Sequence, residues 1–126
     1  MGMRSKQTIV LMDDSEMTLE ATRSTLEARG FDVHAAANLQ QLERKLAGVR
    51  PDLFVLDVQM PEMFGDDVAQ VLREVRKFNV PIVLFSDIDD EALQQRGRDA
   101  GAQACVSKRA GLSGLVARVE ALLGGP

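Results

Sequence analysis

One stretch constrains the fold of this chain more than any other. Residues 53–56 are four large apolar side chains in succession, and the run ends abruptly at Asp57. An uninterrupted apolar run of this length is typical of a strand that is buried on both faces, as in a parallel sheet. Asp57 then stands where the strand emerges at its carboxyl end, the edge at which open α/β sheets bind their ligands. Asp57 is therefore the first candidate for a functional residue.

Apolar runs and amphipathic segments alternate along the rest of the chain. Further strands are predicted at residues 8–12, 31–35, 81–85 and 104–107, and helices at 15–29, 38–49, 68–75, 90–100 and 112–123. Asn38 with Gln41 resembles a capping box at the start of the second helix. The fourth helix is the weakest, because Gly97 inside it lowers helix stability by about 1 kcal/mol relative to alanine. Five strand–helix repeats indicate βαβ units, and right-handed crossovers then build one parallel sheet with helices on both faces.

Length and composition restrict the class of protein. The chain has 126 residues, 45% of them hydrophobic, which is enough apolar mass for the core of one domain spanning residues 1–126. A formal net charge of −4 offers no general attraction for nucleic acid. The single cysteine excludes an intrachain disulfide, and no signal peptide or apolar run of about 20 residues is present. We expect a cytoplasmic protein that contacts neither nucleic acid nor membrane directly.

Polar residues follow the predicted strands at the points where the strands end. Because parallel strands expose their carboxyl ends at one edge, we expect Asp13, Asp14, Asp57, Ser86 and Lys108 to converge there. Three neighbouring carboxylates repel one another unless a cation offsets their charge. Oxygen ligands at a solvated edge favour Mg²⁺, which takes one or two carboxylates together with water and substrate phosphate.

This set of residues suits phosphoryl transfer. A metal ion there would neutralise charge on an incoming phosphoryl group, and Lys108 would add a compact positive charge. Ser86 would donate its hydroxyl to phosphoryl oxygens. Asp57 would be the carboxylate nucleophile that forms an acyl phosphate.

The motifs resemble the receiver domain of response regulators in two-component signalling, the CheY-like family, over nearly the whole chain. The matching pieces are Asp13-Asp14, Asp57-Val58-Gln59-Met60-Pro61 with Gly65, Ser86, and Gly101-Ala102 before Lys108. The resemblance implies the flavodoxin-like (βα)5 fold, a doubly wound sandwich around a five-stranded parallel sheet of order 2-1-3-4-5.

The resemblance also implies a function as a phospho-accepting switch. Asp57 would receive its phosphoryl group from a histidine kinase or a phosphotransfer protein. Asp14, Asp57 and the backbone carbonyl of Gln59 would hold Mg²⁺, and Asp13 would assist through water. The only chemistry expected of such a protein is its own phosphorylation and dephosphorylation, so it is not an enzyme acting on a free metabolite.

Two further site residues would connect phosphorylation to an output. The resemblance implies that Ser86 and Lys108 sense the phosphoryl group and change the surface around the fourth helix and fifth strand. That surface would control an output protein, which the sequence does not identify.

Three positions depart from the family pattern. Cys105 stands where the family has an aromatic residue that swings inward on activation, and cysteine cannot report by that motion. Arg109 follows Lys108 where the family has a proline joined by a cis bond; a cis bond before a non-proline residue costs about 3 kcal/mol, so a trans or strained bond is expected. Asp87 replaces a small residue, and we hypothesise that its carboxylate slows phosphoryl transfer or alters metal affinity.

Two other functions remain as alternatives. These departures would also suit an atypical receiver that docks partners without phosphorylation. A phosphohydrolase that uses an aspartyl phosphate would need an acid two residues after its nucleophile at the first strand, and residues 13–16 lack a convincing one. No second domain is visible after the last helix, so we expect either a stand-alone receiver, acting by protein contact or as a phosphate relay, or part of a longer chain.

Overall fold

Strands and helices alternate along the chain, as predicted. The computed structural model describes residues 6–60 and 64–124. The elements in order are β1 (Thr8–Met12), α1 (Glu16–Ala28), β2 (Asp32–Ala36), α2 (Leu39–Gly48), β3 (Leu53–Leu56), α3 (Gly65–Glu74), β4 (Ile82–Ser86), α4 (Asp90–Ala100), β5 (Ala104–Ser107), the 3-10 turn η1 (Lys108–Ala110) and α5 (Gly111–Leu123). Each predicted strand therefore exists within one residue of its expected bounds, and η1 is the element that sequence patterns did not predict.

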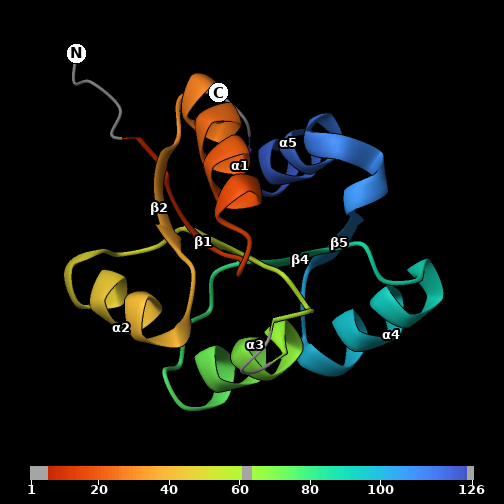
Figure 1. The fold of residues 1–126 in the computed structure, drawn as a ribbon. Helices are drawn as coiled ribbons and strands as arrows, with labels where there is room; N and C mark the ends of the chain where they lie inside the picture. Colours follow the sequence, from red (N-terminus) through yellow and green to blue (C-terminus); the bar gives the residue numbers. More distant parts are fainter. Residues whose placement is uncertain (1–5, 61–63, 125–126) are drawn as a thin grey trace.

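The five strands form one parallel sheet in the order β2-β1-β3-β4-β5. This order confirms the predicted doubly wound, flavodoxin-like fold. Helices α1 and α5 cover one face of the sheet, and α2, α3 and α4 cover the other (Figure 1). β3, which leads into Asp57, lies at the centre, so its apolar residues are buried on both faces as its sequence predicted.

Two apolar layers hold the helices to the sheet. On one face Leu19 and Leu26 of α1 pack with Leu115 of α5 and alternate strand residues. On the other face Leu42 of α2 and Leu93 of α4 pack with the remaining strand residues. Burial of side chains this large contributes about 1.5–3 kcal/mol each, so the two layers fix the strand order that brings the strand ends together.

Short polar side chains begin three of the helices. The Ser15 hydroxyl accepts from the Thr18 N–H at α1, and the Asp89 carboxylate accepts from the Ala92 N–H at α4. Asn38 accepts from the Gln41 N–H at α2, while the Gln41 side chain accepts from the N–H of the residue before Asn38. The predicted cap is therefore present, with its return hydrogen bond displaced by one residue.

Helix α3 buries only part of the apolar stripe that marked it in the sequence. It starts at Gly65, and Val68, Ala69 and Leu72 are buried, whereas Val71 and Val75 are exposed. Val71 and Val75 are exposed because the face of α3 that packs on the sheet is the one formed by Gly65, Val68, Ala69 and Leu72. Pro61 of the motif and the predicted stop at Gly125 lie outside the described residues.

Two features complete the fold. The Gln7 side-chain amide donates to the Leu123 carbonyl over 3.2 Å, which joins the segment before β1 to the end of α5. Of the residues that the structure describes, none belongs to a helix with the length and apolar character needed to cross a bilayer.

Candidate functional site

The ends of β1 and β3 place two carboxylates beside each other. Met12 pairs with Leu56 at the last rung of the β1–β3 ladder, and the Asp57 N–H donates to the Met12 carbonyl over 3.0 Å. Asp13 and Asp57 follow directly on their two strands, and both are buried, at 2% and 5% exposed. Adjacent parallel strands therefore bring the two acids together as predicted.

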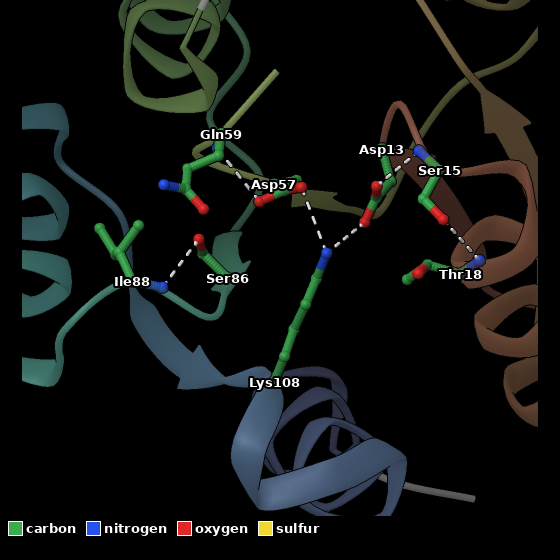
Figure 2. Close-up of polar contacts among 8 residues, drawn as sticks. All are labelled: Asp13, Ser15, Thr18, Asp57, Gln59, Ser86, Ile88 and Lys108. Atoms are coloured by element: carbon green, nitrogen blue, oxygen red, sulfur yellow. Dashed lines mark hydrogen bonds and ion pairs between the residues drawn. The ribbon is translucent and has the colours of Figure 1, made fainter. Parts of the chain in front are cut away.

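Lys108 lies between these two carboxylates. Its Nζ is 2.7 Å from Oδ2 of Asp13 and 3.2 Å from Oδ2 of Asp57 (Figure 2). The lysine comes from the first residue after β5, at the start of η1, and its side chain is 20% exposed. One ammonium group thus joins the ends of three strands.

Burial and neighbouring charge act against each other at Asp57. Desolvation raises the pKa of the Asp57 carboxyl above its ordinary value, and the negative charge of Asp13 raises it further. The Gln59 N–H and the ammonium of Lys108 oppose this increase without cancelling it. Ionisation of Asp57 therefore costs free energy in the folded protein, and an additional cation near the carboxylate would reduce that cost.

The pKa of Lys108 is also raised. Burial favours the neutral amine, but the hydrogen bonds and negative charges of Asp13 and Asp57 together outweigh burial. Lys108 consequently stays protonated, stabilised by two carboxylates, and it would lose one of these two partners if either carboxylate were neutralised.

A third carboxylate completes an acidic cluster. Asp13, Asp14 and Asp57 each offer an oxygen, and these oxygens lie within 4.8 Å of one another. Asp14 is exposed whereas Asp13 and Asp57 are buried, so water has access to one side of the cluster. An all-oxygen donor set with a solvated side suits Mg²⁺, which keeps part of its water shell. The residues present therefore fit a magnesium ion.

Gln59 and Ser86 lie around the same strand ends. The Gln59 backbone N–H donates to Oδ1 of Asp57 over 3.1 Å, so the Gln59 backbone adjoins the carboxylate. Ser86 ends β4, the neighbour of β3, and is fully buried. Its Oγ accepts from the Ile88 N–H at 3.4 Å (Figure 2). Ser86 does not cap α4, because Asp89 does.

The backbone around Asp57 depends on a glycine. A Cβ on Gly65 would collide with the Asp57 carbonyl oxygen, and the Gly65 N–H donates to the Val58 carbonyl over 3.0 Å. The opposing atoms are backbone and cannot rotate away. Only glycine lets α3 approach the loop after β3 this closely, which gives a physical reason for Gly65 in the motif.

The structure brings together the residues that the sequence singled out and adds one. Asp13, Asp14, Asp57 and Lys108 form one cluster. The sequence distinguishes Arg109 only as the residue in place of a proline, yet in the structure its guanidinium binds the Asp87 carbonyl and the Asp90 carboxylate. No sequence pattern predicts these contacts, because they join two loops, and local sequence patterns do not determine the distance between loops.

Two of the three departures from the family pattern now have a geometry. All peptide bonds among the described residues are trans, including the one that joins Lys108 to Arg109. The Cys105 thiol donates to the Leu93 carbonyl over 3.4 Å, and a Cβ on Gly97 would collide with its Sγ. Cys105 and Gly97 therefore fit each other between β5 and α4. The effect of the exposed Asp87 carboxylate stays a prediction.

Comparisons with known proteins agree with this geometry. Residues 9–120 match the family model described as the response regulator receiver domain. Response regulator MprA of Mycolicibacterium vanbaalenii is 34% identical over 91% of this chain, and the regulatory protein PhoP of Bacillus subtilis, named for alkaline phosphatase synthesis, is 32% identical over 91%. The chain spans about half the length of these relatives, at 49% and 48%.

Solved structures share the same fold. Chemotaxis protein CheY4 of Vibrio cholerae superposes with a TM-score of 0.85 at 23% identity, covering 94% of this chain and 99% of that chain. A response regulator from Thermotoga maritima gives a TM-score of 0.81 at 26% identity, covering 96% of this chain and all of the other (100%).

Proposed function

Because this chain belongs to the response regulator receiver domain family, we propose that Asp57 accepts a phosphoryl group and that its phosphorylation switches the protein between two signalling states. The observation that carries the proposal is the bridge from Lys108 to the buried carboxylates of Asp13 and Asp57. A cation between two buried acids stabilises an ionised nucleophile at a water-accessible edge.

Asp57 and the residues around it would have distinct roles in phosphoryl transfer. A carboxylate oxygen of Asp57 attacks phosphorus, the bond from phosphorus to the donor breaks, and an acyl phosphate forms. The Gln59 N–H orients the Asp57 carboxylate through Oδ1. Asp14, Asp57 and the Gln59 carbonyl would hold Mg²⁺, with Asp13 assisting through water, and this site would supply positive charge to the phosphoryl oxygens.

Lys108 and Ser86 respond to the product. Formation of the acyl phosphate removes the charge of the Asp57 carboxylate, so the Lys108 ammonium exchanges that contact for a phosphoryl oxygen. Ser86 gives up the weak contact at 3.4 Å from the Ile88 N–H and donates its hydroxyl instead. Ser86 ends β4, which leads toward α4, and Lys108 directly follows β5, so the surface of α4 and β5 would change. The phosphoryl donor would be a histidine kinase or a phosphotransfer protein in the cytoplasm.

A phosphorylation assay tests the proposal. The protein is incubated with Mg²⁺ and acetyl phosphate and its intact mass is measured. We expect the mass to rise by one phosphoryl group in the wild type and in Asp67→Asn, a control at an exposed carboxylate of α3. The Asp57→Asn variant should gain none. A wild type that takes up no phosphoryl group, or an Asp57→Asn variant that does, contradicts the proposal.

Beryllofluoride separates the switch from the docking module. A competent site should bind this phosphoryl mimic together with Mg²⁺, and amide resonances of residues around Ser86 and Lys108 should shift. A module that docks partners without phosphorylation should bind neither acetyl phosphate nor beryllofluoride, and its spectrum should stay unchanged.

A further inference from the structure

Arg109 connects two loops at the edge of the sheet. One guanidinium nitrogen donates to the Asp87 carbonyl over 3.0 Å, and the other donates to Oδ1 of Asp90 over 2.9 Å. Asp87 and Asp90 lie on the segment from β4 into α4, whereas Arg109 lies in the turn from β5 into α5. The planar fork of arginine suits two acceptors at once.

The two loops that Arg109 connects begin next to Ser86 and Lys108, whose side chains lie near Asp57 (Figure 2). Asp87 directly follows Ser86, and Arg109 directly follows Lys108. The β4–β5 ladder ends at the pair Ser86–Ser107, so ladder hydrogen bonds hold the strands only up to that point. The Arg109–Asp87 hydrogen bond joins the segments that follow β4 and β5 beyond the last ladder pair. It lies at the edge of the sheet where the phosphoryl group would bind.

The backbone of Arg109 also holds the turn that carries Lys108. Its N–H donates to the Ser107 hydroxyl over 3.1 Å, which begins η1 at Lys108. A proline at position 109 could not donate this hydrogen bond and has no side chain that could reach Asp87. This protein therefore fixes the Lys108 turn through a trans arginine that bonds at both its backbone and its side chain.

From these contacts we infer that Arg109 is a positioning residue for phosphoryl transfer. It keeps the loop after Ser86 and the turn at Lys108 at a fixed separation, so that hydroxyl and ammonium reach the same phosphoryl group. The inference rests on the proposed function. Arg109 and Asp90 are largely exposed, at 56% and 73%, and exposed ion pairs contribute little to folding. Removing the arginine should therefore impair the reaction and leave the fold intact.

Three variants and one control test the inference. Arg109→Met removes both side-chain contacts, Arg109→Lys keeps the charge without the fork, and Asp90→Asn keeps the contact to the Asp87 carbonyl. Arg29→Met is the matched control, because Arg29 is 51% exposed and binds the Glu120 carboxylate through two nitrogens, away from the site. The phosphorylation rate with acetyl phosphate is read by intact mass, since the chain contains no Trp or Tyr for fluorescence.

We expect Arg109→Met to slow phosphorylation about tenfold, since small displacements of reacting groups have large effects on rate. Arg109→Lys should fall between it and the wild type, and Asp90→Asn and Arg29→Met should match the wild type. Mg²⁺ affinity by calorimetry and the melting temperature should be unchanged in all four. The Ile88 amide resonance, which reports on the contact to Ser86, should shift in Arg109→Met.

The outcomes separate the two proposals. If the wild type takes up no phosphoryl group, the proposed function fails. If the wild type is phosphorylated and Arg109→Met reacts equally fast, Arg109 is not a positioning residue. If Arg109→Met loses rate, Mg²⁺ affinity and melting temperature together, its role is structural, and the inference is overturned as well.

Discussion

The Lys108 ammonium lies 2.7 Å from the Asp13 carboxylate, although the two residues are 95 positions apart in the chain. This contact exists because β1 and β5 end at the same edge of a parallel sheet. Asp13 is the buried member of the Asp13–Asp14 pair, so its charge depends on Lys108 more than that of Asp14 does. The Lys108–Asp13 contact therefore contributes both to the stability of the fold and to the electrostatics of the site.

Removing this lysine should destabilise the protein. In Lys108→Met the buried charges of Asp13 and Asp57 lose their common partner, and we expect a loss of about 2 kcal/mol in the free energy of unfolding. Urea denaturation measures this change, with the exposed Lys45→Met as control. Added Mg²⁺ should recover part of the loss, because the ion binds the folded state. Equal stability of Lys108→Met and wild type would contradict the importance of the bridge.

Neutralising Asp57 should stabilise the protein when Mg²⁺ is absent. Desolvation, with the charge of Asp13, raises the pKa of Asp57 above its ordinary value of 3.8, so the folded state binds that proton more tightly than the unfolded chain does. Stability therefore falls as pH rises from 3.8 through the higher native pKa. Asp57→Asn should therefore be more stable than the wild type at neutral pH, because it removes the cost of a desolvated charge beside Asp13 and leaves Lys108 paired with Asp13.

The same comparison has a defined dependence on pH. The advantage of Asp57→Asn should shrink as the pH falls through the native pKa and then through 3.8, because below 3.8 the wild-type carboxyl is protonated in both states. Thermal melts of the two proteins across this range measure the difference. An advantage that grows on acidification would have the wrong sign and would refute the electrostatic account of Asp57.

A methyl group at position 97 should be tolerated only when the sulfur at position 105 is removed. The Cβ of Gly97→Ala collides with Sγ of Cys105, but lies 4.0 Å from the Cys105 Cβ and 3.9 Å from the Ala102 Cβ. Gly97→Ala alone should cost about 1–2 kcal/mol by overpacking. The double variant Gly97→Ala/Cys105→Ala should regain most of this stability, and a double-mutant cycle in urea gives the coupling. Additive effects would show that the two residues do not compete for space.

Gly65→Ala should be far more damaging than an ordinary glycine substitution. Its Cβ meets the carbonyl oxygen of Asp57, which is backbone, so the loop after β3 must move. We expect a loss of about 3 kcal/mol or more, together with slower phosphorylation. Gly48→Ala is the matched control, because its added Cβ would meet nothing within 4 Å apart from its chain neighbours and the nearby backbone of helix α2. The control should be neutral or slightly stabilising, and similar losses in both variants would refute the steric explanation.

The sequence predicted the strands and the residues at their ends because both depend on local patterns. The apolar run before Asp57 and the alternation of strands with helices were sufficient for the sheet, and the sheet brings Asp13, Asp14 and Lys108 to Asp57. Burial on α3 was harder to predict, since Val71 and Val75 continue an apolar stripe that the sheet does not cover. Contacts such as that of Arg109 with Asp87 depend on distances between loops, which periodicity does not encode.

The hydrogen bond from Gln7 to the Leu123 carbonyl has a practical consequence. It lies where β1 begins and α5 ends, at the edge of the sheet opposite to Asp57. A fluorescent reporter or an immobilisation tag fused near either of these residues would point away from the acidic cluster. Labelled protein could then be presented to candidate phosphohistidine donors with the reactive carboxylate unobstructed.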